Sequence, residues 1–306
     1  MTRPLPDGSL AAVLTPLTAS GTVDRAALDR LIRWIAEGGV SGLVVLGSSG
    51  EVAALDPAQR REVVTVAVET AHTRGLPVIV GVANPCQAGA LEDITAAGAL
   101  GADAVLVAPP YYAPLDQLSV RRFYDAVGAR AELPVLGYHI PAFTGVPLDP
   151  ATVAALAADG ILAGVKDSNR DLEYFQQMLA IGAGLTRPWS VYTGTDSLLL
   201  PALTLGATGG ITLAANIVPS WTARLAVLAQ AGEIAAAADV QTRLTDLILT
   251  LRRGPFPAGG KAALSVLGLA GPGLVAPAAG LDEKETAILA AELTRIGVTP
   301  DAEVAS

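Results

Sequence analysis

The 306-residue sequence has few cysteines and few charged residues. Its one cysteine, Cys86, has no partner within the chain, so no internal disulfide can form, and a reducing, cytoplasmic compartment is the simplest interpretation. Charged residues make up 16% of the chain and hydrophobic residues 51%, a balance that excludes a disordered chain. The formal net charge of −9 argues against a nucleic-acid surface, which needs clustered Lys and Arg. No apolar run reaches the ~20 residues of a membrane span, so we expect none.

Histidine is almost as scarce as cysteine. His72 and His139 are the only two, and neither lies in a cluster of His, Asp or Glu at ligand spacing. The sequence therefore predicts no metal site. It also lacks a Gly-rich dinucleotide fingerprint at the start of any helix, so we expect no cofactor.

Short apolar, β-branched segments alternate with longer amphipathic segments along most of the chain. This order is typical of a parallel sheet that is buried on both faces. The predicted strands are Leu10–Leu17, Gly42–Gly47, Val78–Ala83, Ala104–Pro110, Val135–Ile140, Leu162–Lys166, Ser190–Gly194 and Gly210–Ala214.

The segments between the strands have helix start and stop signals. The stretch 24–37 opens on Asp24, has apolar residues at helical spacing and ends at Gly38-Gly39. Similar signals predict helices at Arg60–Arg74, Leu91–Ala97, Leu118–Ala131, Pro150–Ala158, Leu172–Ile181, Ser197–Leu205 and Ser220–Ala231.

Eight such strand–helix units without a composition break favour a TIM (β/α)8 barrel over a doubly wound open sheet. We predict that the barrel occupies residues 1–232. Residues 233–306 have no strand pattern and predict three helices, Glu233–Arg252, Lys261–Leu269 and Asp282–Ile296. This C-terminal helical extension is expected to pack on the barrel or on a neighbouring subunit.

Only three lysines are present, and one of them stands out. Lys284 lies in a charged run and is expected on a solvated helix face, and Lys261 is expected at the surface or at a helix end. Lys166 instead ends the apolar strand 161–165, at the edge of the barrel where active sites lie. Its two interpretations are a catalytic amine and a structural ion pair with Asp167 or Asp171.

A buried lysine at this place suits Schiff-base formation with a ketone. The reaction needs a free amine, which burial in apolar surroundings favours. It also needs a proton shuttle, and Tyr138 on the adjacent strand is the best-placed hydroxyl, although a buried structural tyrosine is an equal alternative. The segment Gly47-Ser48-Ser49-Gly50 could bind an anion such as a carboxylate, or could be an ordinary turn.

Five motifs, in this order and spacing, make the sequence resemble the dihydrodipicolinate synthase and N-acetylneuraminate lyase family of class I, pyruvate-dependent aldolases. The resemblance spans nearly the whole chain. The motifs are Gly47-Ser48-Ser49-Gly50-Glu51, Pro109-Pro110-Tyr111-Tyr112, Tyr138-His139-Ile140-Pro141 with Thr144-Gly145, Gly164-Val165-Lys166-Asp167-Ser168, and Gly194-Thr195-Asp196 followed by Leu205-Gly206-Ala207 and Gly210-Ile211-Thr212.

The resemblance implies a role for each matching residue. Lys166 would form the imine with pyruvate or another 2-oxo acid, and Tyr138 would be the acid/base residue. Ser48 and Ser49 would bind the pyruvyl carboxylate, with Ser48 also in a proton relay, and the backbones of Gly194 and Ile211 would line the imine pocket. Tyr112 would complete the relay across a subunit contact, because family members are commonly homotetramers built as dimers of dimers.

One departure from the family pattern bears on the substrate. Phe143 stands where the synthases resemble one another in having an arginine that binds a second substrate carboxylate, and an apolar ring cannot replace that cation. We therefore predict a lyase that cleaves a 2-oxo-3-deoxy or 4-hydroxy-2-oxo acid to pyruvate and an aldehyde, or the reverse. The alternatives are dihydrodipicolinate synthase activity and a non-catalytic 2-oxo-acid-binding paralogue.

Overall fold

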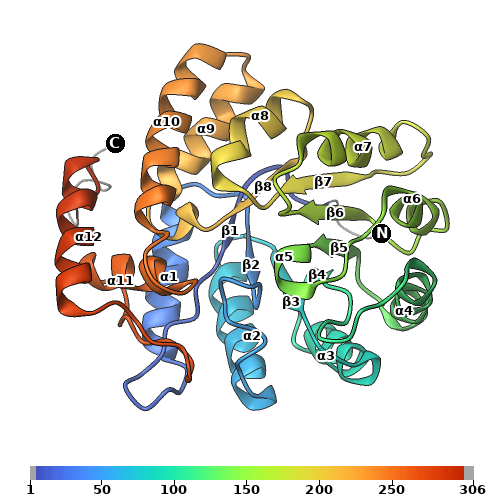
Figure 1. Ribbon diagram of the computed structural model, residues 1–306, viewed down its shortest axis with the longest axis horizontal. Helices are drawn as coiled ribbons and strands as arrows, with labels where there is room; N and C mark the ends of the chain where they lie inside the picture. The colour runs from blue at the N-terminus through green and yellow to red at the C-terminus, as the bar shows by residue number, and fades with distance from the viewer. Residues whose placement is uncertain (1–4, 300–306) are drawn as a thin grey trace.

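The computed structural model describes residues 5–299. Eight parallel strands follow one another around a closed barrel in chain order, and the last pairs with the first (Figure 1). This closure confirms the predicted barrel and excludes the open sheet. The strands are β1 (Gly8–Ala12), β2 (Gly42–Val45), β3 (Val78–Val82), β4 (Ala104–Val107), β5 (Val135–His139), β6 (Gly164–Asp167), β7 (Ser190–Thr193) and β8 (Gly209–Thr212).

The helices form an outer layer around these strands, and short helical turns lie in the loops. The predicted barrel helices are all present, with bounds that differ by a few residues. They are α1 (Arg25–Glu37), α2 (Pro57–His72), α3 (Gln87–Ala99), α4 (Gln117–Arg130), α6 (Pro150–Ala158), α7 (Leu172–Gly182), α8 (Leu199–Thr204) and α9 (Pro219–Gln230). Two short turns were not predicted, because three or four residues show no helical periodicity: α5 (Pro141–Thr144) and η2 (Ala214–Asn216). A third turn, η1 (Asp196–Leu198), overlaps the start of the predicted helix Ser197–Leu205.

Local capping explains where the first helices begin. The Asp24 carboxylate accepts the Ala27 N–H at 2.9 Å and starts α1. Asp56 and Gln59 form a reciprocal capping box at the start of α2, with Pro57 in the first helical position. These side chains satisfy N–H groups that have no partner inside the helix. The start predicted at Asp24 is confirmed, whereas α2 begins at Pro57, before the predicted Arg60.

The first strand is shorter than predicted. β1 ends at Ala12, and the Leu14 N–H donates to the side chain of Asn216 at 2.9 Å instead of to a neighbouring strand. The side-chain Nδ2 of Asn216 in turn donates to the carbonyl of Ala12 at 2.8 Å. A buried side chain that follows β8, the neighbouring strand in the closed barrel, therefore ends this strand.

Side chains alternate between the interior and the exterior of the barrel along each strand. The interior is filled by one apolar cluster that includes Leu10, Val44, Ile79, Leu106 and Leu136. The outward-facing residues belong to a second cluster, which also contains the inner faces of the helices. The barrel is thus solid, and an open site can lie only at its end.

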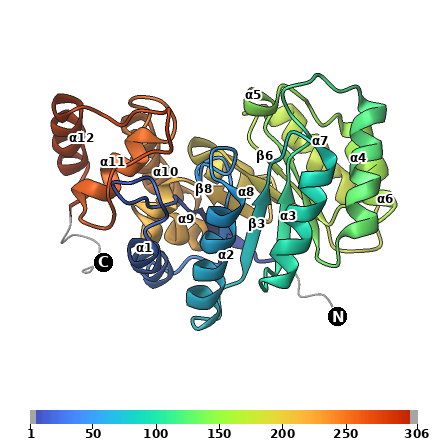
Figure 2. The same cartoon turned by 90° about the horizontal axis from the view of Figure 1, so that it is seen from below.

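Three helices follow the barrel: α10 (Ile234–Thr250), α11 (Ala258–Val266) and α12 (Glu283–Arg295). They lie together on one side of the barrel, in orange and red in Figures 1 and 2, where α10 packs against α9 and α12 packs against α11. This confirms the predicted C-terminal helices. The division into two units at residue 232 stays a prediction, and residues 300–306 lie outside the described residues. In the described chain, no helix combines the length and apolar character needed to cross a bilayer.

Candidate active site

Lys166 and Tyr138 face each other inside the barrel. They occupy paired positions of β6 and β5, so the pleat directs both side chains to the interior. The lysine Nζ lies 3.4 Å from the tyrosine Oη and 4.5 Å from the centre of its ring. Lys166 is 3% exposed and Tyr138 5%. The structure therefore brings the predicted amine and the predicted hydroxyl into contact.

The two acidic residues considered as partners of Lys166 have other roles. Asp167 is next along the strand, so it points to the exterior, where its Oδ1 lies 2.9 Å from Nδ1 of His139. Asp171 caps α7 by accepting the N–H groups of Glu173 and Tyr174. The structural ion-pair interpretation of Lys166 is therefore wrong.

The Ser48 hydroxyl extends the pair into a chain of three groups. Its Oγ lies 3.1 Å from the Oη of Tyr138, so a proton can pass between the two hydroxyls. Ser49, which is buried, lines the same cavity as Lys166. Both serines thus lie at the cavity that contains Lys166, and their binding of a carboxylate stays a prediction.

The loop that carries these serines has a tight backbone. Leu46 and Glu51 both have left-handed backbone conformations, with φ of 55° and 57°. The loop also passes so close to Gly81 of β3 that a Cβ there would overlap the Leu46 carbonyl. Strain of this kind is found where the surrounding structure holds a functional loop in place.

Gly194 keeps space free beside Lys166. A Cβ at residue 194 would lie 2.7 Å from the lysine Cε and would overlap the Ser168 hydroxyl. Ile211 is buried in β8 and lines the cavity together with Gly194. Both predicted pocket residues therefore line the cavity that contains the amine.

These side chains open into a cavity of about 600 Å³. An adjoining cavity of about 490 Å³ shares five lining residues with it: Ser48, Tyr138, Ile140, Phe143 and Phe256. Its remaining walls come mainly from the loop after β2 and from residues 275–278. Tyr138 and Ser48 thus lie where the two cavities meet, and Lys166 lines the larger one.

Phe143 forms an apolar wall between the two hollows. It lies on α5, is 60% exposed, and its ring centre is 5.7 Å from that of Phe256. Ala142 and Pro141 beside it also line the larger cavity. This wall offers a substrate apolar contact and no positive charge.

Tyr112 is not brought to the site within one chain. Its side chain is 97% exposed and its backbone is left-handed, with φ of 80°. Its neighbour Tyr111 instead lines the smaller cavity, and burial raises the pKa of the Tyr111 hydroxyl. The role of Tyr112 in a partner subunit's relay stays a prediction.

Lys261 is fully buried, so its predicted place at the surface is wrong. Its ammonium group forms an ion pair with Glu51 and donates to the Gly273 carbonyl at 2.7 Å. Glu51 also accepts the Val275 N–H at 2.8 Å. The pair ties the serine loop to the 273–275 segment. Burial lowers the pKa of Lys261, whereas the adjacent Glu51 charge raises it.

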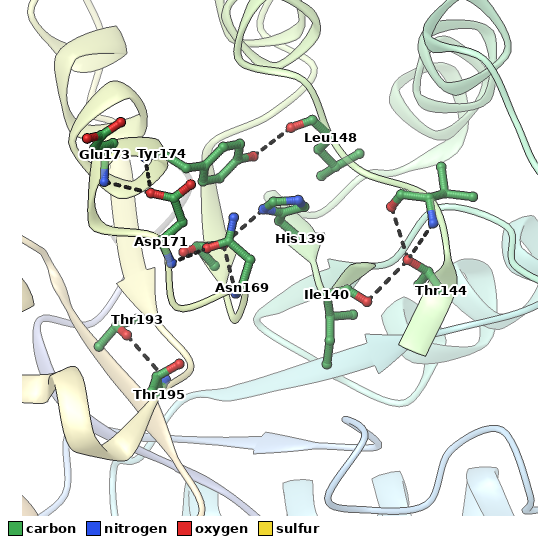
Figure 3. A network of polar contacts seen from close by, with 12 residues as sticks. His139, Ile140, Thr144, Leu148, Asn169, Asp171, Glu173, Tyr174, Thr193 and Thr195 are labelled. Carbon is green, nitrogen blue, oxygen red and sulfur yellow. Dashed lines mark hydrogen bonds and ion pairs between the residues drawn. The ribbon is translucent and has the colours of Figure 1, made fainter. Parts of the chain in front are cut away.

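A chain of polar contacts holds the loop between β6 and α7 (Figure 3). Asp167 accepts the Asn169 N–H at 3.2 Å, and Asn169 accepts the Asp171 N–H at 2.7 Å. The His139 ring, bonded to Asp167, lies against the Tyr174 ring with centres 4.1 Å apart. These contacts fix the segment that follows Lys166.

Four charged residues of the larger cavity were missed at the level of sequence: Arg170, Asp196, Arg252 and Arg253. Asp196 is buried and accepts the Ala214 N–H at 2.7 Å. Its burial raises the pKa of its carboxyl, while the Ala214 N–H and the Lys166 charge act in the opposite direction. Asp196 follows Gly194 in one of the quoted motifs, so its place after a strand was the available signal.

Within residues 5–299, His, Cys, Asp and Glu do not gather in groups of three or more that could hold a metal ion. The exposed Cys86 lies beside Asn84 and not in the larger cavity. The chemistry available at the mouth is therefore that of an amine, hydroxyls and carboxylate and guanidinium groups.

A parallel barrel with a buried lysine beside a tyrosine at the carboxyl ends of its strands has the architecture of a Schiff-base-forming lyase. A sequence profile of the Dihydrodipicolinate synthetase family matches residues 5–296. The chain belongs to this family, whose members are pyruvate-dependent enzymes that form or cleave carbon–carbon bonds.

Individual relatives agree with this assignment. A 4-hydroxy-tetrahydrodipicolinate synthase of Anaeromyxobacter sp. is 35% identical over 295 residues, covering 95% of this chain and 98% of the relative. An uncharacterized DapA-like lyase of Halobacterium salinarum is 36% identical over 292 residues, covering 95% and 94%. The structure of YagE from E. coli K12, in complex with pyruvate, matches with a TM-score of 0.91 at 29% identity, covering 95% and 99%.

Proposed function

We propose that this protein cleaves a 2-oxo-3-deoxy or 4-hydroxy-2-oxo acid to pyruvate and an aldehyde, or catalyses the reverse addition, through an imine on Lys166. The observation that carries the proposal is the contact chain from the Lys166 amine through the Tyr138 hydroxyl to the Ser48 hydroxyl.

The first steps need one amine and one hydroxyl. The Lys166 nitrogen adds to the C2 carbonyl, and water leaves with a proton from Tyr138, which gives a protonated imine and a phenolate. The phenolate then takes the proton of the C4 hydroxyl as the C3–C4 bond breaks. The bonding electrons move to the imine, so an aldehyde departs and an enamine remains.

The last steps return the enzyme to its starting state. Tyr138 protonates C3 of the enamine, water adds to the resulting imine and returns a proton to Tyr138, and pyruvate leaves Lys166. Ser48 passes protons between Tyr138 and the cavity. Ser49 binds the pyruvyl carboxylate, and Gly194 leaves the space in which the imine forms.

The second candidate is 4-hydroxy-tetrahydrodipicolinate synthase activity, with pyruvate and aspartate semialdehyde as substrates. Several relatives have this name, including the Anaeromyxobacter protein. The Phe143 position supports the lyase proposal instead, because the arginine of the synthases is absent there and the arginines of this cavity come from other segments. A non-catalytic paralogue would bind pyruvate without exchanging its methyl protons, which NMR measures.

The test is reductive trapping. Incubation with pyruvate and borohydride is expected to leave a stable adduct on the Lys166 peptide, identified by mass spectrometry, and pyruvate release from a panel of 2-oxo acids identifies the substrate. Lys166→Ala should lose both signals, whereas Lys284→Ala, which changes an exposed lysine, should keep both. An active enzyme with unmodified Lys166 refutes the mechanism, and saturable turnover of aspartate semialdehyde favours the synthase.

We also propose a homotetramer in which Tyr112 enters the site of a neighbouring subunit. The nearly complete exposure of a tyrosine beside a left-handed backbone supports this proposal. The pyruvate dependence of the family and the exposed, unpaired Cys86 support a cytoplasmic location. Analytical ultracentrifugation tests the assembly, and Tyr112→Phe should lower kcat without changing the sedimentation coefficient.

A further inference from the structure

Two arginines line the cavity that contains Lys166. Arg170 lies in the loop between β6 and α7, four residues after the amine, and Arg252 lies just after the end of α10. Both side chains are largely exposed at the mouth. The barrel and the C-terminal helices thus each contribute one guanidinium group to the same hollow.

Arg170 and Arg252 differ from the neighbouring Arg253 in that neither forms an ion pair with a described residue. Arg253 also lines the cavity, but it donates to the Glu292 carboxylate at 2.8 Å. Within residues 5–299, neither Arg170 nor Arg252 has a carboxylate within the 4.0 Å of an ion pair. Two cations that share a cavity and form no ion pair with a carboxylate attract an anion from solution.

The electrostatics of Arg252 agree with this geometry. Its burial and the positive charge of Arg170 both lower the pKa of Arg252, whereas Asp196 raises it. Asp196 is the acidic group of the cavity that faces Arg252, and burial favours its neutral form. An incoming anion would relieve the repulsion between the two arginines.

The loop holds Arg170 in an uncommon conformation. Its φ of 66° is in the left-handed region, which residues with a side chain adopt at an energetic cost. The bonds of Asp167 to Asn169 and of Asn169 to Asp171 hold the residues on both sides of it (Figure 3). A side chain that is held in this way at a cavity mouth suits a binding role.

We propose that Arg170 and Arg252 bind an anionic group, carboxylate or phosphate, at the aldehyde end of the substrate. The inference rests on the proposed function, because the substrate is anchored as an imine on Lys166. Ser48 and Ser49 occupy the pyruvyl side of the cavity, so the rest of the substrate extends toward the mouth. There Phe143 and Phe256 form an apolar wall, and the two arginines supply the charge that this wall lacks.

The experiment measures aldol addition of pyruvate to matched aldehydes. Succinic semialdehyde is compared with butanal for a carboxylate, and glyceraldehyde 3-phosphate with glyceraldehyde for a phosphate. Wild type should prefer one or both anionic members. Arg170→Gln and Arg252→Gln should each lower kcat/KM for that member by about tenfold and leave its neutral counterpart within about twofold. Arg122→Gln, which removes an exposed charge from α4, is the control.

The outcomes separate the two proposals. Equal rates for charged and neutral aldehydes, or equal losses for both in the arginine variants, overturn the arginine site while borohydride trapping of pyruvate on Lys166 still supports the proposed function. Absence of trapping in wild type overturns both. A preference confined to the carboxylate or to the phosphate pair, lost in the variants, supports the site and identifies the anion.

Discussion

Replacing Lys261 with methionine should destabilise the protein strongly. The side chain is 0% exposed, and its ammonium group contacts both Glu51 and the Gly273 carbonyl. Methionine fills a similar volume but leaves the Glu51 carboxylate buried without a cation. Removing one partner of a buried ion pair costs about 3–5 kcal/mol.

This loss corresponds to a measurable shift in melting temperature. The entropy of unfolding near the midpoint is about 2.1 cal/mol/K per residue, so 306 residues give about 0.6 kcal/mol/K and a fall in Tm of roughly 5–8 °C. Scanning calorimetry at one fixed protein concentration measures the shift. Lys284→Met, which changes an exposed lysine on α12, should move the free energy of unfolding by less than about 0.5 kcal/mol.

A double variant tests the cause. In Lys261→Met with Glu51→Gln, the glutamine carbonyl can still accept the Val275 N–H and no buried charge remains unpaired. We expect this variant to recover at least half of the lost stability. An unchanged Tm in the single variant, or strictly additive losses in the double variant, would refute the reasoning that the two charges stabilise each other.

Three further predictions concern the cavity. Gly194→Ala places a Cβ 2.7 Å from the Cε of Lys166 and should lower kcat/KM at least about 100-fold in steady-state assays, and an unchanged kcat/KM would contradict the need for free space beside the amine. Tyr138→Phe should lower kcat about 10²–10⁴-fold while borohydride still traps pyruvate on Lys166, and an undiminished kcat would exclude the tyrosine as the acid/base residue. Since burial raises the pKa of Asp196, the folded state binds more protons than the unfolded chain between pH 3.8 and the raised pKa, so stability from this group falls as pH rises. The slope of Tm against pH above 4 should therefore be less negative in Asp196→Asn, and identical slopes would contradict the raised pKa.

The sequence by itself determined the barrel and the position of its lysine. Strand and helix periods, with caps such as Asp24, are local properties, and eight regular units leave few topologies other than closure. The scarcity of lysine and the apolar strand before Lys166 then pointed to the amine. Because parallel strands bring their carboxyl ends to one edge, Tyr138 and Ser48 followed from their places in the chain.

Only the tertiary structure decided which distant side chains meet. Lys261 follows two glycines at the start of a helix and has no local sign of burial, since its partner Glu51 comes from the other end of the chain. Arg170 and Arg252 likewise share a cavity because α10 packs beside the barrel. Ion pairs and cavities depend on through-space distance, which the order of residues constrains only within single elements and their immediate neighbours.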